Sequence, residues 1–246
     1  MYKNRFSITF VMIFLFVLAI KAQNKKSLWT IDATKTENYV GAPIANGKIG
    51  ILPWKEPFSV RHVMLNHVFF FFDAGVNQAL QGINPFQMAV SIDGKKIEEA
   101  NIKNWKQSID LKKAVHTTTF TVPGQAEIKY NVIALRNLPY SGLIQVEVKA
   151  LKDLSLQAIN EMEIPNGYQQ IQKRLISANV GLDGGKEMIL QTEALSAKGA
   201  QRVIATSEYI FDHKKFNLKQ ENDSKNILNA SLKKGETVTF SLVGSI

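Results

Sequence analysis

The stretch numbered His116 to Ala150, HTTTFTVPGQAEIKYNVIALRNLPYSGLIQVEVKA, decides the fold class. Three runs in it are rich in β-branched residues and alternate apolar with polar positions: His116 to Val122, Glu127 to Ala134 and Leu143 to Ala150. A period of two is typical of strands that bury one face. Pro123-Gly124 and the segment from Pro139 to Gly142 separate the runs and predict turns. The stretch therefore predicts successive antiparallel strands.

The same pattern continues on both sides of this stretch. Upstream, strands are predicted at Leu28–Ala33, Val60–Leu65, Val68–Phe72 and Phe86–Ile92. Downstream, strands are predicted at Leu175–Val180, Met188–Ala194, Val203–Phe211 and Val238–Val243. Asp93-Gly94 favours a two-residue hairpin, and Asp183-Gly184-Gly185 predicts a tight turn. Helical patterns are limited to weak turns at Asn24–Leu28 and Lys214–Lys219. The sequence predicts an all-β protein, a large antiparallel β-sandwich.

The first residues predict export. Lys3 and Arg5 precede an apolar run from Ile8 to Ile20, and the small residue Ala22 follows. This order is typical of a signal peptide, and the apolar run is shorter than the roughly 20 residues of a membrane-spanning helix. We expect residues 1–22 to be a signal peptide and residues 23–246 to be one β-domain, periplasmic or secreted, that meets a membrane only during export.

The composition and charge of the chain argue against nucleic acid as a partner. Without the predicted signal peptide, 27 basic and 21 acidic residues remain, a net charge of +6. The lysines form scattered pairs such as Lys95-Lys96 and Lys233-Lys234, whereas nucleic-acid binding usually focuses basic residues on one face. Nucleic-acid binding is therefore not predicted. The chain has no cysteine, so burial of apolar side chains, without disulfides, must stabilise the fold.

Motifs for catalysis, metal binding and cofactor binding are not found. The sequence has no Gly-x-Ser-x-Gly and no His-Glu-x-x-His. Glu161 and Glu163 would share a face if they lay on a strand, and Asp73 follows an apolar run in which burial could raise its pKa. Surface carboxylates at sheet edges explain these residues equally well. No catalytic residue, metal site or cofactor is predicted.

Aromatic residues are the main candidates for contacts. Phe69 to Phe72 are four consecutive phenylalanines, and side chains alternate along a strand, so two of them should face a second apolar surface. That surface is a second sheet, a partner domain or a sugar. The candidate contact residues for a domain interface or a sugar are Trp54, Phe70, Phe72 and Asp73.

Three segments of the chain follow one another in an order and at a spacing found in a known enzyme family. The first, Val40-Gly41-Ala42-Pro43-Ile44-Ala45-Asn46-Gly47-Lys48-Ile49-Gly50, resembles the Asn-Gly-x-x-Gly segment near the start of glycoside hydrolase family 65. Ser108-Ile109-Asp110-Leu111-Lys112-Lys113-Ala114 is similar to its Leu-Asp-Met-x-x-Gly segment, although Ala114 replaces a common glycine. Leu135-Arg136-Asn137-Leu138-Pro139-Tyr140 is similar to its Arg-x-Leu-Pro turn. The resemblance extends from about Trp29 to the C-terminus.

Glycoside hydrolase family 95 has a related N-terminal domain, but two features favour family 65. The residue before Asn46 is Ala45, where family 95 has a glycine. The Glu-Asp-x-x-Trp run that family 95 carries next is missing after Leu65-Asn66.

The resemblance implies a β-super-sandwich of the galactose-mutarotase-like type. In family 65 this domain precedes an (α/α)6 barrel that carries the catalytic glutamate, and no position here corresponds to that residue. The resemblance therefore implies a non-catalytic domain of an enzyme acting on α-glucosides, with the barrel as its partner in cis or in trans. On this interpretation Trp54 and the phenylalanine run lie at the interface, and Phe70→Ser or Phe72→Ser leaves the domain folded. The alternative is a free-standing periplasmic carbohydrate-binding module.

Overall fold

The computed structural model describes residues 28–71, 77–180, 185–196 and 201–246. The chain divides into two compact units, residues 1–30 and residues 31–246. The sheets described below belong to the second unit. The predicted signal peptide lies outside the described residues, as does the turn at 183–184. Among the described residues, the structure contains no helix with the length and apolar character needed to cross a membrane.

Strands dominate the described residues, with one short 3-10 turn, η1 (Glu99–Asn101). The first half contains β1 (Thr30–Ala33), β2 (Ile44–Ala45), β3 (Ile49–Pro53), β4 (Val60–Phe71), β5 (Asn77–Gln81), β6 (Met88–Ile92), β7 (Lys95–Lys96), β8 (Lys103–Asp110) and β9 (Val115–Val122). The second half contains β10 (Ala126–Ala134), β11 (Ser141–Ala150), β12 (Leu154–Glu161), β13 (Gln169–Val180), β14 (Gly185–Leu195), β15 (Arg202–Phe211), β16 (Phe216–Asn222), β17 (Lys225–Leu232) and β18 (Thr237–Ser245).

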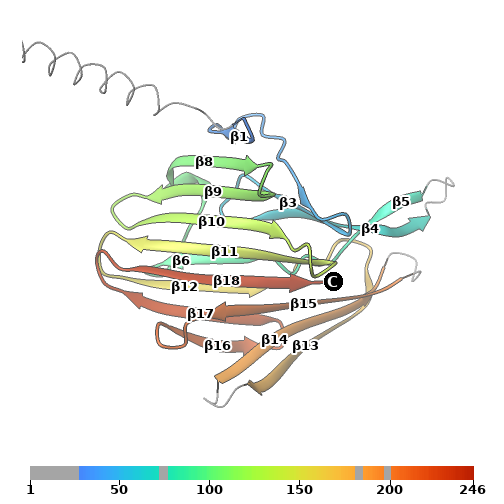
Figure 1. The fold of residues 1–246 in the computed structure, drawn as a ribbon. Helices are drawn as coiled ribbons and strands as arrows, with labels where there is room; N and C mark the ends of the chain where they lie inside the picture. The colour runs from blue at the N-terminus through green and yellow to red at the C-terminus, as the bar shows by residue number, and fades with distance from the viewer. Residues whose placement is uncertain (1–27, 72–76, 181–184, 197–200) are drawn as a thin grey trace, which may run out of the picture. The chain divides into compact units, whose positions relative to one another are not determined.

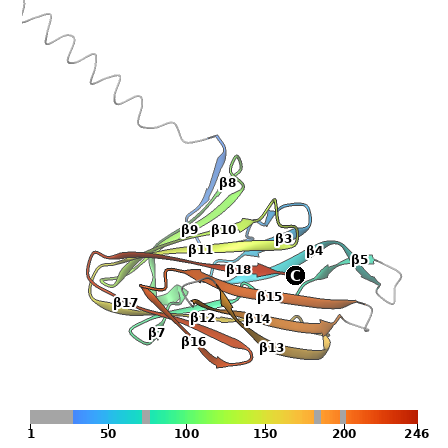
Figure 2. The same cartoon turned by 60° about the horizontal axis from the view of Figure 1, so that its bottom comes forward.

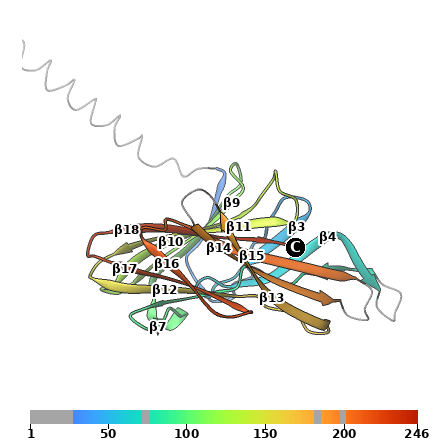
Figure 3. The same ribbon diagram turned by 90° about the horizontal axis from the view of Figure 1, so that it is seen from below.

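The strands form three sheets arranged in layers. The largest has nine strands in the order β1-β8-β9-β10-β11-β18-β15-β14-β13, and it faces the viewer in Figure 1. A five-stranded sheet, β16-β17-β12-β6-β7, and a four-stranded sheet, β2-β3-β4-β5, complete the fold. Seen from below in Figure 3, β10, β11 and β18 form one layer, and β12 and β17 lie in the layer beneath it. The predicted antiparallel β-sandwich is confirmed.

The main core fills the space between the layers. Alternate residues of β9, β10 and β11 are buried, as the sequence pattern predicted, and Val132, Ile144 and Val146 are among them. They pack against buried residues of the two smaller sheets, such as Ile51 of β3 and Leu156 of β12. Each apolar face is therefore removed from water by the opposite layer, which is the dominant stabilising term of the fold.

Phe86 is fully buried because two glycines face it. Gly142 of β11 and Gly244 of β18 are directly paired neighbours in the large sheet. A Cβ atom on Gly142 would lie 2.8 Å from Phe86 Cζ, and one on Gly244 would lie 2.7 Å from Phe86 Cε1. The paired glycines thus create the space that the ring occupies.

Buried amides connect the layers. Asn160 of β12 donates to the carbonyls of Pro85 and Gln87 at 3.0 and 2.9 Å and accepts a hydrogen bond from Ser207 of β15. Asn226 of β17 donates to Met188 O of β14 at 2.8 Å. These bonds compensate the cost of burying polar groups and fix the relative position of the sheets.

One predicted helical turn is wrong. Residues Lys214–Lys219 lie mostly in the strand β16, which pairs with β17 over Phe216 to Asn222. Phe216 is buried, and its ring lies 5.6 Å from that of Phe240 in the opposite sheet. Burial of this side chain against the core overrides the weak local preference for a turn.

The two strands predicted at Val60–Leu65 and Val68–Phe72 form one strand, β4. Its pairing with β5 shifts between Leu65 and Phe69, and His67 has a positive φ of 65° at this bulge. Beyond the bulge, β4 and β5 form a two-stranded ribbon that extends past the sheets in Figures 1 and 2. The bulge therefore directs Phe69, which is exposed, away from the main core.

Candidate functional site

Trp54 lies in an aromatic corner next to the end of β3. Its backbone N–H donates to Ser59 O at 2.9 Å, which closes the turn into β4. The guanidinium carbon of Arg61 lies 4.2 Å from the centroid of the Trp54 ring, a cation–π contact. Tyr39 meets the ring edge-on at 5.2 Å between centroids, and Tyr39 also contacts Trp105 at 5.7 Å.

Buried Gln107 holds this corner together. Its Nε2 donates to Trp54 O at 2.8 Å, and its Oε1 accepts a hydrogen bond from the hydroxyl of Tyr39. Gly41 has a φ of 77°, and a Cβ atom there would lie 3.0 Å from Trp54 Cζ3. Burial raises the pKa of Tyr39 to about 12, so its hydroxyl stays protonated. Much of the Trp54 ring is thus occupied by contacts within the chain.

Of the four predicted contact residues, only Trp54 and the backbone of Phe70 lie in the described part of the chain. Arg61, beside Trp54, is near the start of β4, whereas Phe70 is near its end and pairs with Gln78 of β5. Nine positions along β4, including the bulge between Leu65 and Phe69, separate them. Phe72 and Asp73 lie outside the described residues. The backbone of Phe70 therefore lies toward the other end of β4 from Arg61, the neighbour of Trp54.

A cavity of about 740 Å³ lies at one end of the five-stranded sheet, beside the β3–β4 turn and η1. Its buried apolar residues include Met88, Ile97 and Met162. Five glutamates line it: Glu56, Glu98, Glu99, Glu161 and Glu163. Its size falls in the range of roughly 300–1,000 Å³ typical of small-molecule sites. We call this feature the glutamate pocket.

The glutamate pocket contains both carboxylates singled out by the sequence. Glu161 ends β12, and Glu163 forms an isolated bridge with Asn84, so they do not share one regular strand. Lys225 and Lys173 lie 3.4 and 3.9 Å from Glu161. Asn84 Nδ2 donates to Glu163 Oε2 at 3.4 Å.

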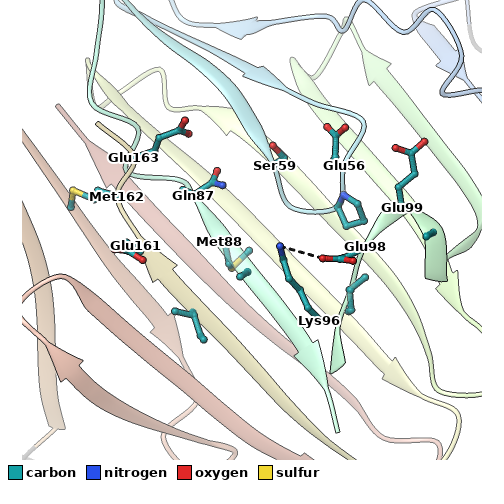
Figure 4. A pocket seen from close by; sticks show the side chains of 15 residues that line it. Glu56, Ser59, Gln87, Met88, Lys96, Glu98, Glu99, Glu161, Met162 and Glu163 are labelled. Carbon is teal, nitrogen blue, oxygen red and sulfur yellow. Dashed lines mark ion pairs between the residues drawn. The ribbon is translucent and has the colours of Figure 1, made fainter. Parts of the chain in front are cut away.

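Other pocket carboxylates also have basic neighbours. Lys96 lies 3.5 Å from Glu98, the ion pair drawn in Figure 4, and Lys55 lies 3.4 Å from Glu99. Gln87 Oε1 is buried at the pocket without a hydrogen-bond partner. The pocket therefore presents mainly acceptors, which suit a ligand that carries hydroxyl groups. Among the described residues, no group of three or more His, Cys, Asp or Glu side chains is arranged to hold a metal ion.

A surface that the sequence reasoning missed crosses the outer face of the large sheet. Cross-strand pairs place Ile133 of β10 beside Leu143 of β11, Leu143 beside Val243 of β18, and Val243 beside Glu208 of β15. Ile189 of β14, next to the Leu190–Ser207 pair, continues the row and pairs with Ile176 of β13. We call these six residues the cross-sheet strip. The sequence signal was an apolar residue at an outward position in five of these six adjacent strands, with Glu208 at the sixth.

The layers and strand order define a class, the β-super-sandwich domain. Comparisons with known proteins agree. The chain is 32% identical to a kojibiose hydrolase of Mucilaginibacter mallensis over 98% of this chain and 36% of that protein. It is 27% identical to a kojibiose hydrolase of Flavobacterium johnsoniae over 89% of this chain and 33% of that protein. No protein-family model matches the chain.

A solved structure provisionally described as a kojibiose phosphorylase from human microbiome shares the fold. It covers 82% of this chain and 29% of its own, with a TM-score of 0.59 and 14% identity. The chain thus spans about a third of the length of the curated relatives that it matches. These relationships confirm the resemblance to glycoside hydrolase family 65, and the chain is an N-terminal sandwich domain of that family.

Proposed function

We propose that this chain is the non-catalytic N-terminal domain of an exported, family 65-like enzyme that acts on α-glucosides. The observation that carries the proposal is the match of nearly the whole chain to about a third of two kojibiose hydrolases. The domain supports a catalytic (α/α)6 barrel, which supplies the catalytic glutamate. The order of charged, apolar and small residues at 1–22 supports export to the periplasm or the medium.

A chimera tests this proposal. The matching third of the M. mallensis kojibiose hydrolase is replaced by this chain, and hydrolysis of kojibiose is measured. The proposal predicts a soluble, active chimera, whereas the relative without that third loses solubility or activity. A folded but inactive chimera, together with full activity of the shortened relative, contradicts a supporting role.

The glutamate pocket favours a second function, carbohydrate binding by the domain itself. Its volume and its acceptor-rich lining suit a hydroxylated ligand. Isothermal titration of the chain with kojibiose, maltose and trehalose tests this function. Binding that is lost in Gln87→Ala and kept in Glu127→Gln, on β10 of the large sheet, supports a sugar site. If a folded sample gives no heat of binding, the sugar site is contradicted and the supporting role is the only proposed function that remains.

A further inference from the structure

The outer face of the large sheet carries exposed apolar side chains that the fold leaves uncovered. Ile176 exposes 43% of its surface, and Ile204 and Ile210 on β15 expose 44% and 58%. The other apolar members of the cross-sheet strip are half-buried by their neighbours. In Figure 1 no described strand or turn of residues 31–246 covers this part of the face. Uncovered apolar side chains gathered on one face of a sheet are typical of an interaction surface.

The same face carries glutamates, and one of them, Glu208, lies within the cross-sheet strip. Of three half-buried glutamates on β14 and β15, Glu193 lies 3.4 Å from Arg174 and also pairs with Arg202. Glu208 and Glu187 have no basic partner among the described residues. Burial, with a smaller contribution from Glu187, raises the pKa of Glu208. A half-buried carboxylate in an apolar row costs free energy unless a cation compensates it.

We propose that the cross-sheet strip, together with Ile204, Ile210 and Glu187, is the surface on which the remaining two thirds of such an enzyme docks. The docking partner presents apolar side chains and a lysine or arginine that pairs with Glu208. This inference rests on the proposed function, because the occupant is the portion of the relatives' chain that lies beyond this domain.

The dimensions of the patch suit a contact between domains. The strip crosses six strands, about 24 Å at the usual strand spacing, and Ile204 to Ile210 extends about 20 Å along β15. The rectangle that encloses both covers about 500 Å², so a contact across it would bury at most about 1,000 Å² on both partners together. Interfaces between domains of one chain bury roughly 600–1,500 Å².

Cysteine accessibility tests the surface, because the chain has no cysteine of its own. Ile210→Cys is placed in the isolated chain and in the active chimera, and maleimide labelling of the site is followed by peptide mass spectrometry. Leu111→Cys, on the exposed β8–β9 turn, is the matched control. We expect labelling at position 210 to be at least about tenfold slower in the chimera than in the isolated chain, with the control unchanged.

Two results would overturn the inference. The first is equal labelling of Ile210→Cys in the isolated chain and in an active chimera, which refutes this surface and leaves the proposed function intact. The second is labelling of Ile210→Cys in the isolated chain that becomes slower as the protein concentration rises. That result would show that a second copy of the chain covers this face. An inactive chimera that does not fold counts instead against the proposed function.

Charge reversal gives an independent readout. Glu208→Lys removes repulsion from Glu187 in the isolated chain, so its melting temperature should not fall. In the chimera the new lysine meets the basic partner, so the melting temperature should fall or the transition should split. Asp223→Lys, on the exposed turn after β16 in another sheet, should have no such effect in the chimera. Equal effects of both variants in the chimera contradict the proposed contact.

Discussion

His116 shows how one buried side chain makes stability depend on pH. It is 1% exposed, and its Nδ1 has no hydrogen-bond partner. Burial lowers its pKa to about 4 from an ordinary value of 6.5. The folded state therefore binds fewer protons than the unfolded state between these values, and stability falls as pH decreases through this window.

The expected effect is up to about 3 kcal/mol of unfolding free energy lost between pH 7 and pH 4. Carboxylates titrate at the lower end of the same range, so the difference between wild type and His116→Leu isolates the histidine. We expect the variant to lose less stability over this interval, as measured by urea unfolding at both pH values. Parallel pH profiles of the two proteins contradict this account.

Glu208 makes stability depend on pH with the opposite sign. Its pKa is raised from 4.5, so the folded state binds more protons than the unfolded state just above pH 4.5, and stability decreases as pH rises through the raised pKa. Glu208→Gln should therefore stabilise the isolated chain at pH 7, by about 0.5 kcal/mol or less because the group is partly exposed. Below pH 4.5 the gain should disappear. A loss of stability at pH 7 in urea unfolding contradicts an uncompensated carboxylate.

At the scale of the element, the pair Gly142–Gly244 should be intolerant of side chains. Gly142→Ala places a Cβ 2.4 Å from Ile51 Cδ1 and 2.8 Å from Phe86 Cζ. We expect it to lower the unfolding free energy by about 1–3 kcal/mol, because overpacking forces the core to shift. Gly50→Ala on β3 is the control, since its nearest neighbour would be 3.9 Å away. Equal melting temperatures of the two variants contradict this packing.

Strands whose inward positions are all apolar could be predicted from sequence, and β10 and β11 are examples. The hairpin at Asp93-Gly94 was also predictable, since both residues have positive φ, 51° and 76°. In contrast, β8, β12 and β17 were not predicted. Their inward positions include Gln107, Asn160 and Asn226, which are buried because distant backbone carbonyls accept their hydrogen bonds. Such partners are invisible in a local pattern.

At the scale of the whole molecule, the candidate sites were harder to predict than the fold. The sequence singled out Glu161, Glu163 and Trp54, and the structure places the two glutamates at one pocket and Trp54 in an aromatic corner. The cross-sheet strip was not predicted, because its residues come from six strands and become neighbours only through their register. Local patterns specify which face of a strand is buried, but cross-strand pairing decides what lies side by side.

The central claim is that this domain supports a catalytic region, and the specificity constant of the chimera for kojibiose tests it most directly. The control is the intact M. mallensis hydrolase, and the relative lacking its matching third is the lower reference. We predict a kcat/KM within about tenfold of the intact enzyme, equivalent to less than about 1.4 kcal/mol of lost transition-state stabilisation. A soluble, folded chimera with no more activity than the shortened relative would contradict the claim.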